Sequence, residues 1–237
     1  MSSSDERVIG IDLGTTNSCL GLWESGRVEI LSNDMGSRTT PSMVTFVEGG
    51  RPIVGTSSKN QRGISSPRDT VYAIKRIIGR KFNDTEVKAD RARWPFTVVN
   101  NGGSPFLKVA SEDGETQIVP PELVSSLVLG HLKGIAETYC GKPVTKAVIT
   151  CPAYFNDSQR LATKHAASIA GLDVIGMINE PTAAALAYGF ENKKDASVMV
   201  FDFGGGTLDV TVLTLEGECL EVLVRRDCFV WCHCPFL

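Results

Sequence analysis

The chain has 237 residues, of which 24 are Lys or Arg and 27 are Asp or Glu, so its formal net charge is −3. This slightly acidic balance argues against nucleic-acid binding, and no apolar run approaches the ~20 residues of a membrane-spanning helix. The polar start, residues 1–7, leads directly into an apolar strand, so we expect no signal peptide, no membrane contact and a cytoplasmic or nuclear protein.

The first expected element is a hairpin over residues 8–22, in which two apolar runs flank a short loop. Asp12 ends the first run, and the loop that follows contains Gly14, Thr15 and Thr16. We expect two further strands, residues 28–31 and 42–47. The opening of the chain therefore reads as antiparallel β structure.

Residues 70–79 have a helical pattern, because apolar side chains recur at spacings of three and four up to a glycine that suits a helix end. Lys75 and Arg76 lie inside this apolar segment. A basic side chain there either extends to the surface or points into a cleft, and the surface is the more common outcome. We expect loop structure at 87–106, a small hairpin at 108–119 and a helix from Pro121 to Tyr139.

From residue 146 onward, apolar strands and helices alternate. Pro152 ends the first strand of this series, and Asn156 is placed to cap the helix that follows. Glu180 comes between the next strand and the helix expected at 182–189. A carboxylate at a helix N-terminus is favourable in itself, but strand ends that enter helices are also where α/β proteins place catalytic groups.

The last strong pattern is a second hairpin, residues 198–213, with a run of three glycines at its turn. Its polar and glycine residues are Asp202, Gly204, Gly205, Gly206, Thr207 and Asp209. Bare backbone N–H groups admit an anion, and neighbouring carboxylates suit Mg²⁺. A plain glycine turn with two solvated aspartates is the alternative interpretation.

The two hairpins repeat one pattern. When they are superimposed in sequence, Asp12 falls on Asp202 and Gly14 falls on Gly204. This repetition suggests an internal duplication whose two loops face each other across a cleft, each holding one phosphate. The chain has neither a Walker loop nor a G-x-G-x-x-G run, so other phosphate-binding folds lose their main support.

Four segments in this order resemble the 70-kDa heat-shock chaperone family, and they are residues 10–19, 152–160, 179–185 and 201–210. The resemblance runs from about residue 7 to residue 224. It implies an α/β protein with the actin-like ATPase (ribonuclease-H-like) fold, here lobe I plus the first hairpin of lobe II. The expected division is a partial nucleotide-binding domain at 1–224 and a tail at 225–237 without similarity to the family.

The resemblance also implies roles for individual residues. The carboxylates around Mg²⁺, which they reach mainly through water, are expected to be Asp12, Glu180 and Asp202. The first phosphate loop is expected at Gly14, Thr15 and Thr16. The second is expected at Gly204, Gly205, Gly206 and Thr207.

The same resemblance assigns catalytic roles to Lys75, Glu180, Asp202 and Thr207. Lys75 matches the lysine that orients the attacking water, which reverses the surface expectation given above. Asp209 is implicated with Asp12 in binding a monovalent cation, K⁺. Pro152 and Arg160 match a switch between the nucleotide state and a peptide-binding domain. The expected ligands are therefore ATP or ADP, Mg²⁺ and K⁺.

Two departures from the family affect the functional prediction. Leu208 stands where Phe is common, and the sequence after residue 224 no longer follows the family. We therefore expect a chain that lacks most of lobe II and the peptide-binding domain, and hence no direct client binding. This leaves three hypotheses open: a chaperone-type ATPase of the stress response, a non-catalytic module or decoy for J-domain co-chaperones, and a non-functional truncation. An actin-like sugar kinase is the alternative within the enzyme class.

Overall fold

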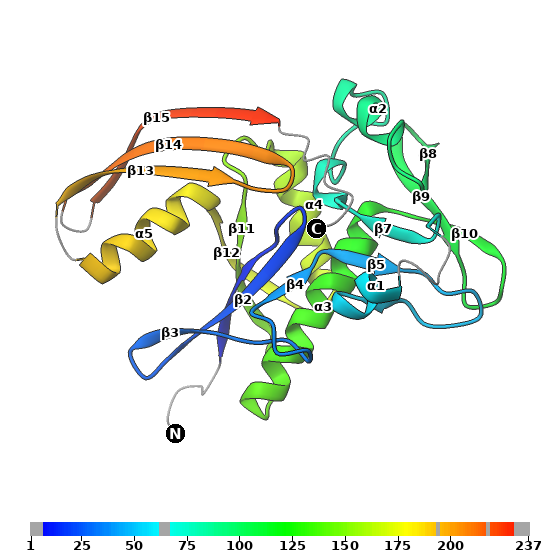
Figure 1. Cartoon of the computed structure of the whole chain (residues 1–237), viewed down its shortest axis with the longest axis horizontal. Helices are drawn as coiled ribbons and strands as arrows, with labels where there is room; N and C mark the ends of the chain where they lie inside the picture. The colour runs from blue at the N-terminus through cyan, green and yellow to red at the C-terminus, as the bar shows by residue number, and fades with distance from the viewer. Residues whose placement is uncertain (1–6, 62–66, 193–194, 217–218, 230–237) are drawn as a thin grey trace.

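The computed structural model describes residues 7–61, 67–192, 195–216 and 219–229. Three regions are visible in Figure 1: a central sheet backed by two long helices, a group of small sheets beside it, and a three-stranded sheet that carries one helix. The central region contains β1 (Val8–Asp12), β2 (Asn17–Glu24), β3 (Arg27–Ile30), β4 (Thr39–Pro41), α3 (Pro121–Cys140), β11 (Lys146–Cys151), α4 (Asp157–Ile169) and β12 (Asp173–Asn179).

The small sheets contain β5 (Met43–Thr45), β6 (Ile53–Val54), α1 (Thr56–Gln61), β7 (Thr70–Tyr72), the 3₁₀ helix η1 (Ile74–Arg76), α2 (Thr85–Arg91), β8 (Thr97–Asn101), β9 (Ser104–Ala110) and β10 (Thr116–Val119). The last region contains α5 (Glu180–Asn192), β13 (Ala196–Phe203), β14 (Thr207–Glu216) and β15 (Cys219–Phe229). No helix in the described ranges is long and apolar enough to cross a membrane.

The central sheet has the order β12-β11-β1-β2-β3, with β4 beside β2. The first three strands are parallel, and β1, β2 and β3 are antiparallel. Because side chains alternate along a strand, Ile9 and Ile11 enter the core while Asp12 stays on the exposed face. The core continues into α3 and α4 through Leu129 and Ala166. This packing places the end of β1 beside the end of β11.

The two long helices begin where the sequence predicts. α3 starts with Pro121, whose missing N–H costs nothing in the first turn, and it ends at Gly141 in the left-handed region at φ 66°. Asn156 caps α4: its side chain accepts a hydrogen bond from the Gln159 backbone N–H at 3.0 Å, and the Gln159 side chain accepts one from the Asn156 N–H at 3.3 Å.

The prediction of a helix at residues 70–79 is wrong. Residues 70–72 form β7, which pairs antiparallel with β5, and only residues 74–76 are helical, as a single 3₁₀ turn. Val71 is fully buried opposite Val44. The spacing of apolar residues fits a helix, but β-branched side chains in a buried pairing suit a strand better. A left-handed residue, Ala73 at φ 55°, then turns the chain into η1.

The prediction of loop structure at residues 87–106 is also wrong. This segment contains most of α2 and a β8–β9 hairpin whose turn is Gly102-Gly103, with φ of 59° and 89°. Two successive positive φ values define the turn that matches the twist of paired strands, and two glycines adopt it without strain. The expected hairpin at 108–119 is confirmed as the β9–β10 pair.

The second expected hairpin is confirmed as β13 and β14, which pair antiparallel with Asp202 opposite Asp209. β15 adds a third strand and runs through residue 224 to Phe229. The domain boundary at 224 stays a prediction, and residues 230–237 of the expected tail lie outside the described residues. α5 begins at Glu180, two residues earlier than expected.

Candidate functional site

The first glycine loop, residues 14–16, is fastened at both ends by Ser42. The Ser42 hydroxyl donates to the Gly14 carbonyl at 2.7 Å, and the Ser42 backbone N–H donates to the Thr16 carbonyl at 2.8 Å. A side chain on Gly14 would collide with the backbone of Asn17, whose carbonyl carbon would lie 3.2 Å from the added Cβ and whose oxygen would lie closer still. Glycine is therefore required here for close packing.

The second glycine loop, residues 204–207, lies directly against the first. Its turn is closed by the Gly204 N–H, which donates to the Thr207 carbonyl at 2.9 Å. A Cβ on Gly205 would lie 3.0 Å from the Cβ of Thr16 and closer to its hydroxyl. The two loops that the sequence relates by repetition thus face and touch each other.

Lys75 meets Glu180 beside these loops. The Lys75 Nζ donates to the Glu180 Oε1 in an ion pair whose side chains are only 11% and 14% exposed. η1 supplies the lysine and the first residue of α5 supplies the carboxylate, 105 positions later. The prediction that the Lys75 side chain extends to the surface is therefore wrong. The structure places it in a buried position, as the family resemblance implies.

Three carboxylates share this space. Burial raises the pKa of Glu180; Lys75 opposes the shift, while the negative charges of Asp12 and Asp202 add to it. Burial also raises the pKa of Asp202, again with a contribution from Asp12. Asp12 therefore acts on both Glu180 and Asp202, and Asp202 acts on Glu180, although these residues come from β1, α5 and β13. Thr150 orients Asp12 by donating its hydroxyl to the Asp12 Oδ1 at 2.8 Å.

Asp209 faces a different neighbour. Its charge, after burial, is the largest contribution that raises the pKa of the Tyr154 hydroxyl, which also hydrogen-bonds to Thr207. Asp209 itself is buried. The structure therefore places Asp209 on the Tyr154 side of the hairpin, whereas Asp12 acts on Glu180 and Asp202.

Pro152 and Arg160 lie at the carboxyl end of β11. The Arg160 guanidinium joins three segments, because it donates to the Cys151 Sγ at 2.9 Å, to the Asn179 Oδ1 at 2.9 Å and to the Phe155 carbonyl at 3.1 Å. Asn179 immediately precedes Glu180 in the chain. Arg160 therefore connects the turn after Pro152 to the segment that carries Glu180.

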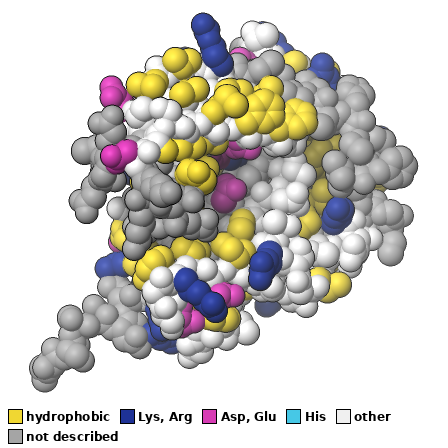
Figure 2. Space-filling model, turned by 60° about the vertical axis from the view of Figure 1, so that its left-hand side comes forward, with side chains coloured by type: hydrophobic (Ala, Val, Ile, Leu, Met, Phe, Trp, Pro, Cys, Tyr) yellow, Lys and Arg dark blue, Asp and Glu magenta, His cyan; other side chains and the backbone are white. Residues whose placement is uncertain are grey.

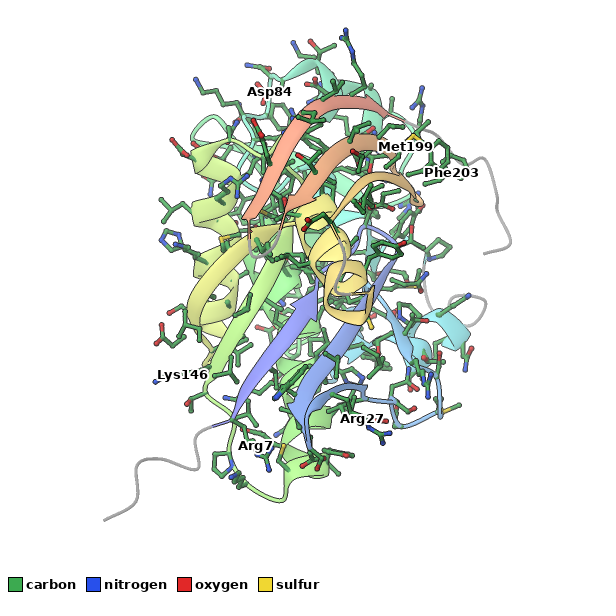
Figure 3. All side chains as sticks on the ribbon, turned by 90° about the vertical axis from the view of Figure 1, so that its left-hand side faces the viewer. Arg7, Arg27, Asp84, Lys146, Met199 and Phe203 are labelled. Carbon is green, nitrogen blue, oxygen red and sulfur yellow. The ribbon has the colours of Figure 1, made fainter. Side chains whose placement is uncertain are left out.

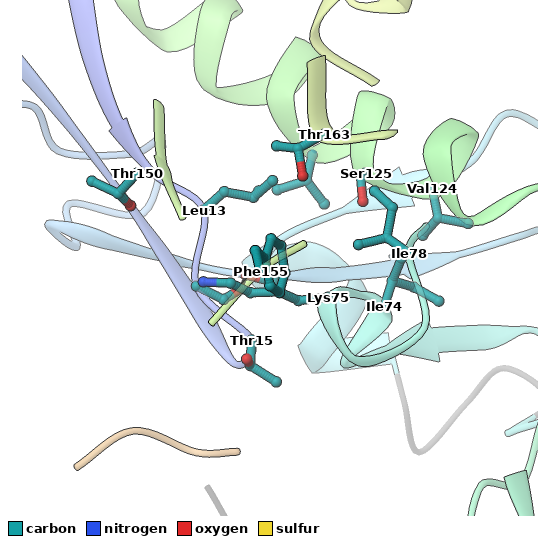
Figure 4. A pocket seen from close by; sticks show the side chains of 13 residues that line it. Leu13, Thr15, Ile74, Lys75, Ile78, Val124, Ser125, Thr150, Phe155 and Thr163 are labelled. Carbon is teal, nitrogen blue, oxygen red and sulfur yellow. Dashed lines mark hydrogen bonds between the residues drawn. The ribbon is translucent and has the colours of Figure 1, made fainter. Parts of the chain in front are cut away.

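Two hollows adjoin the loops. The larger, about 450 Å³ including space open to solvent, lies behind the first loop, and Figure 4 shows its lining side chains from the first loop, η1, α3, β11 and α4. The smaller, about 310 Å³, has Arg76, Asp90 and Tyr154 in its wall. Thr15, Lys75 and Phe155 line both. Neither has Asp12, Glu180 or Asp202 among its lining residues, although Lys75, which pairs with Glu180, lines both.

The donor set fits Mg²⁺ held through water. Within the described ranges, no three His, Cys, Asp or Glu side chains lie close enough together to hold a metal ion directly. The charge of Asp12 nevertheless helps to raise the pKa of both Glu180 and Asp202, and a divalent cation would offset this repulsion. Mg²⁺ binds oxygen ligands and usually keeps several of its waters, so carboxylates at this wider spacing suit it.

Comparison with known proteins decides the family. The family described as "Hsp70 protein" matches residues 8–226. The chain belongs to the Hsp70 family. It therefore has the actin-like ATPase fold of the Hsp70 nucleotide-binding domain, as expected from the sequence, and this sets aside the sugar-kinase alternative.

Individual Hsp70 relatives agree. The chain is 53% identical over 221 residues to "Heat shock 70 kDa protein BIP3" of Oryza sativa subsp. japonica, 51% identical over 216 residues to "Heat shock 70 kDa protein" of Neurospora crassa, and 50% identical over 224 residues to "Putative heat shock 70 kDa protein 7" of Homo sapiens. These alignments cover 92%, 90% and 94% of the chain. The chain spans about a third of the length of the first two Hsp70 relatives and 60% of the third.

Residues that sequence reasoning did not single out complete the Hsp70 site. Ser42 fastens the first loop and Thr150 holds Asp12. Arg76 donates to the Gly206 carbonyl at 2.9 Å. The surface position expected for Arg76, together with Lys75, is therefore wrong, because the Arg76 side chain is only 10% exposed. Isolated serines and threonines give no comparable signal in the sequence.

Proposed function

We propose that the chain binds ATP with Mg²⁺ between its two glycine loops and hydrolyses it to ADP and phosphate, as the nucleotide-binding part of an Hsp70-type chaperone. The observation that carries this proposal is the contact between the loops beside the buried Lys75–Glu180 pair. Backbone N–H groups of both loops would donate hydrogen bonds to phosphate oxygens. Glycine at 205 removes the side chain that would separate the loops, and glycine at 14 lets the first loop close against the backbone of Asn17.

Positioning and charge explain the catalytic roles. Mg²⁺, when bound, supplies positive charge that neutralises the phosphates and the carboxylates. Phosphoryl transfer requires little covalent chemistry from the protein, which acts mainly by orienting the attacking water and stabilising charge. Lys75 orients this water through its ammonium group, Glu180 fixes the ammonium, and Thr207 donates to the transferred phosphate from the second loop. Asp12 and Asp202 would hold the hydrated cation.

Thermal unfolding of the full chain with and without saturating Mg-ATP tests binding. A ligand that binds only the native state at a hundredfold excess over its Kd adds about 2.7 kcal/mol, which corresponds to a rise of several degrees for a chain of this size. Asp12→Asn should remove most of the rise, whereas Lys133→Ala, on α3 where its ammonium donates to the Ala170 and Gly171 carbonyls, should keep it. Cooperative unfolding without any rise in the unaltered chain would contradict the proposal.

Hydrolysis needs a separate assay. Lys75→Ala should reduce single-turnover release of phosphate at least tenfold, because it removes the group that orients water. It should also leave Mg-ATP binding within a few-fold, because the loops and carboxylates remain. An unaltered chain that binds Mg-ATP but releases no phosphate would restrict the function to nucleotide binding.

The remaining family properties belong to the same proposal. K⁺ binding near Asp12 and Asp209 predicts a larger Mg-ATP effect in potassium than in sodium. A J-domain partner predicts faster phosphate release on addition of a purified J-domain. The proposed cytoplasmic or nuclear location and the role in the stress response are tested by cell fractionation before and after heat shock.

A further inference from the structure

One charged side chain connects the small-sheet region to the second glycine loop. Arg76 lies in η1, directly after Lys75, and its side chain is 10% exposed. The Arg76 Nη1 donates to the Gly206 carbonyl at 2.9 Å, across 130 positions of sequence. The loop is therefore held by its backbone, independently of its side chains.

Asp90 fixes the orientation of this guanidinium. The Asp90 carboxylate, on α2, accepts from the Arg76 Nε at 2.6 Å and from the Arg76 Nη2 at 3.3 Å. The Asp90 side chain is only 1% exposed. A buried carboxylate is costly unless it is paired, and the planar guanidinium offers two parallel donors to it. Two nitrogens of the guanidinium, Nε and Nη2, thus bind Asp90, and the third, Nη1, donates to the loop.

Gly206 allows this approach. A Cβ on Gly206 would lie 3.2 Å from the Arg76 Nη1 and 3.0 Å from the Thr15 Cγ2. Gly206 is itself buried. Arg76 and Thr15 of the first loop therefore both lie against the second loop at Gly206.

We propose that Arg76 and Asp90 are positioning residues that hold the second glycine loop at its distance from the first, with Arg76 acting on Gly206 and Asp90 acting through Arg76. The effect on nucleotide rests on the proposed function, because it requires that the loops bind phosphate. The effect on the loop itself does not. Loss of either side chain frees the loop, so the amides of residues 204–207 become less protected and phosphate binding weakens.

Hydrogen exchange of the full, nucleotide-free chain tests the first effect. Asp90→Asn removes the charge that orients Arg76, and Arg76→Lys keeps the positive charge but replaces the fork by a single ammonium that cannot bond Asp90 twice and also reach Gly206. Glu86→Gln is the matched control, because Glu86 is also on α2 and pairs with Arg80 at 3.2 Å. We expect about tenfold faster exchange at residues 204–207 in both test variants, as a charge-assisted hydrogen bond is lost, and no change in the control or in α3.

Mg-ATP affinity of the same variants tests the second effect. Both should bind about tenfold more weakly than Glu86→Gln, and the double variant Arg76→Lys/Asp90→Asn should be no worse than the weaker single one, because the two act as one unit. Unchanged exchange at 204–207 in Arg76→Lys, or additive effects in the double variant, would overturn the proposal. If Asp90→Asn does not fold, hydrogen exchange at residues 204–207 and Mg-ATP affinity of Arg76→Lys alone test the proposal. If the unaltered chain does not bind Mg-ATP, the proposed function fails while exchange still decides the positioning role.

Discussion

At the scale of residues, the site depends on pairs that come from distant parts of the chain. Lys75 and Glu180 are 105 positions apart, and each would be costly to bury without the other. Glycines matter in the same way, because the absence of a side chain at 14 and 205 allows backbones and loops to approach each other. Single side chains and single missing side chains therefore decide the geometry of the two loops.

Gly14→Ala should destabilise the chain through a steric collision. The new Cβ would press on the backbone of Asn17, and forcing a side chain into packed surroundings costs about 1–3 kcal/mol. Gly10→Ala is the control on the same hairpin, since its Cβ would meet only the Gly21 carbonyl at an ordinary 3.8 Å. Chemical denaturation should show a lower free energy of unfolding for Gly14→Ala alone. Equal effects of the two changes would argue against the collision.

Asp202→Asn should stabilise the metal-free chain at neutral pH. Burial and the charge of Asp12 raise the pKa of Asp202, so the native state holds this proton more tightly than the unfolded state does. The stability that Asp202 contributes is therefore complete below its unfolded pKa of 3.8 and is lost as pH rises through the higher native pKa. The uncharged amide avoids this loss.

The measurement is thermal unfolding in EDTA at pH 7 and near pH 4. The variant should unfold about 1–3 °C higher at pH 7, and the difference should shrink towards pH 4. The same change should abolish the Mg-ATP effect, because it removes a carboxylate that we propose holds the hydrated cation. A variant that is less stable than the unaltered chain at pH 7 would show that Asp202 is stabilised by its surroundings.

At the scale of elements, η1 is placed by its contact with α4. Gly79 follows η1 at φ 67°, and its Cα lies so close to the first turn of α4 that a Cβ would be 2.6 Å from the Gln159 Cα and 2.7 Å from the Ser158 carbonyl oxygen. This turn is also the capped start of α4. The position of Lys75 therefore depends on backbone contact between two elements, in addition to its own ion pair.

Gly79→Ala should cost more than its backbone strain. An alanine at positive φ costs about 1–2 kcal/mol, and the collision with α4 adds about 1–3 kcal/mol. Gly141→Ala separates the two contributions, because Gly141 has φ 66° with nothing within 4 Å of an added Cβ. Chemical denaturation should give a much lower free energy of unfolding for Gly79→Ala than for Gly141→Ala. Only Gly79→Ala should also slow phosphate release, since it displaces η1; similar results for both would assign the whole cost to strain.

At the scale of the whole molecule, the sheet of β13, β14 and β15 has one face towards α5 and one towards solvent. Met199, Phe201 and Phe203 lie on the outer face, and Figure 3 shows the labelled Met199 and Phe203 at the outer side of β13. Their partners on β14 are also apolar, namely Val212, Val210 and Leu208. Figure 2 shows the resulting band of hydrophobic side chains at the height of this sheet, above a recess that contains acidic side chains. A contiguous apolar surface of this kind favours association.

Phe201→Ser should reduce self-association of the 237-residue chain. Phe201 is 61% exposed, so its loss should change the thermal unfolding temperature by no more than about 1–2 °C. Trp23→Ser is the matched control, since Trp23 is 57% exposed but lies on β2, away from this face. Sedimentation velocity should show less association, and a hydrophobic dye should bind less, for Phe201→Ser only. Equal effects of both changes would show that the sheet face has no special role.

The sequence by itself determines the family, the fold and the identity of the loop and carboxylate residues, because these depend on local patterns: strand–Asp–glycine loop–strand repeats, caps such as Asn156, and four ordered motifs. It misassigns residues 70–79 and 87–106, where pairing with distant strands and a two-glycine turn outweigh spacing and composition. Only the tertiary structure decides that Lys75 turns inward, that the loops touch, and that Arg76 and Asp90 hold the second loop. These features arise from burial and from contacts between residues that are distant in sequence, and no local pattern specifies which distant residues will meet.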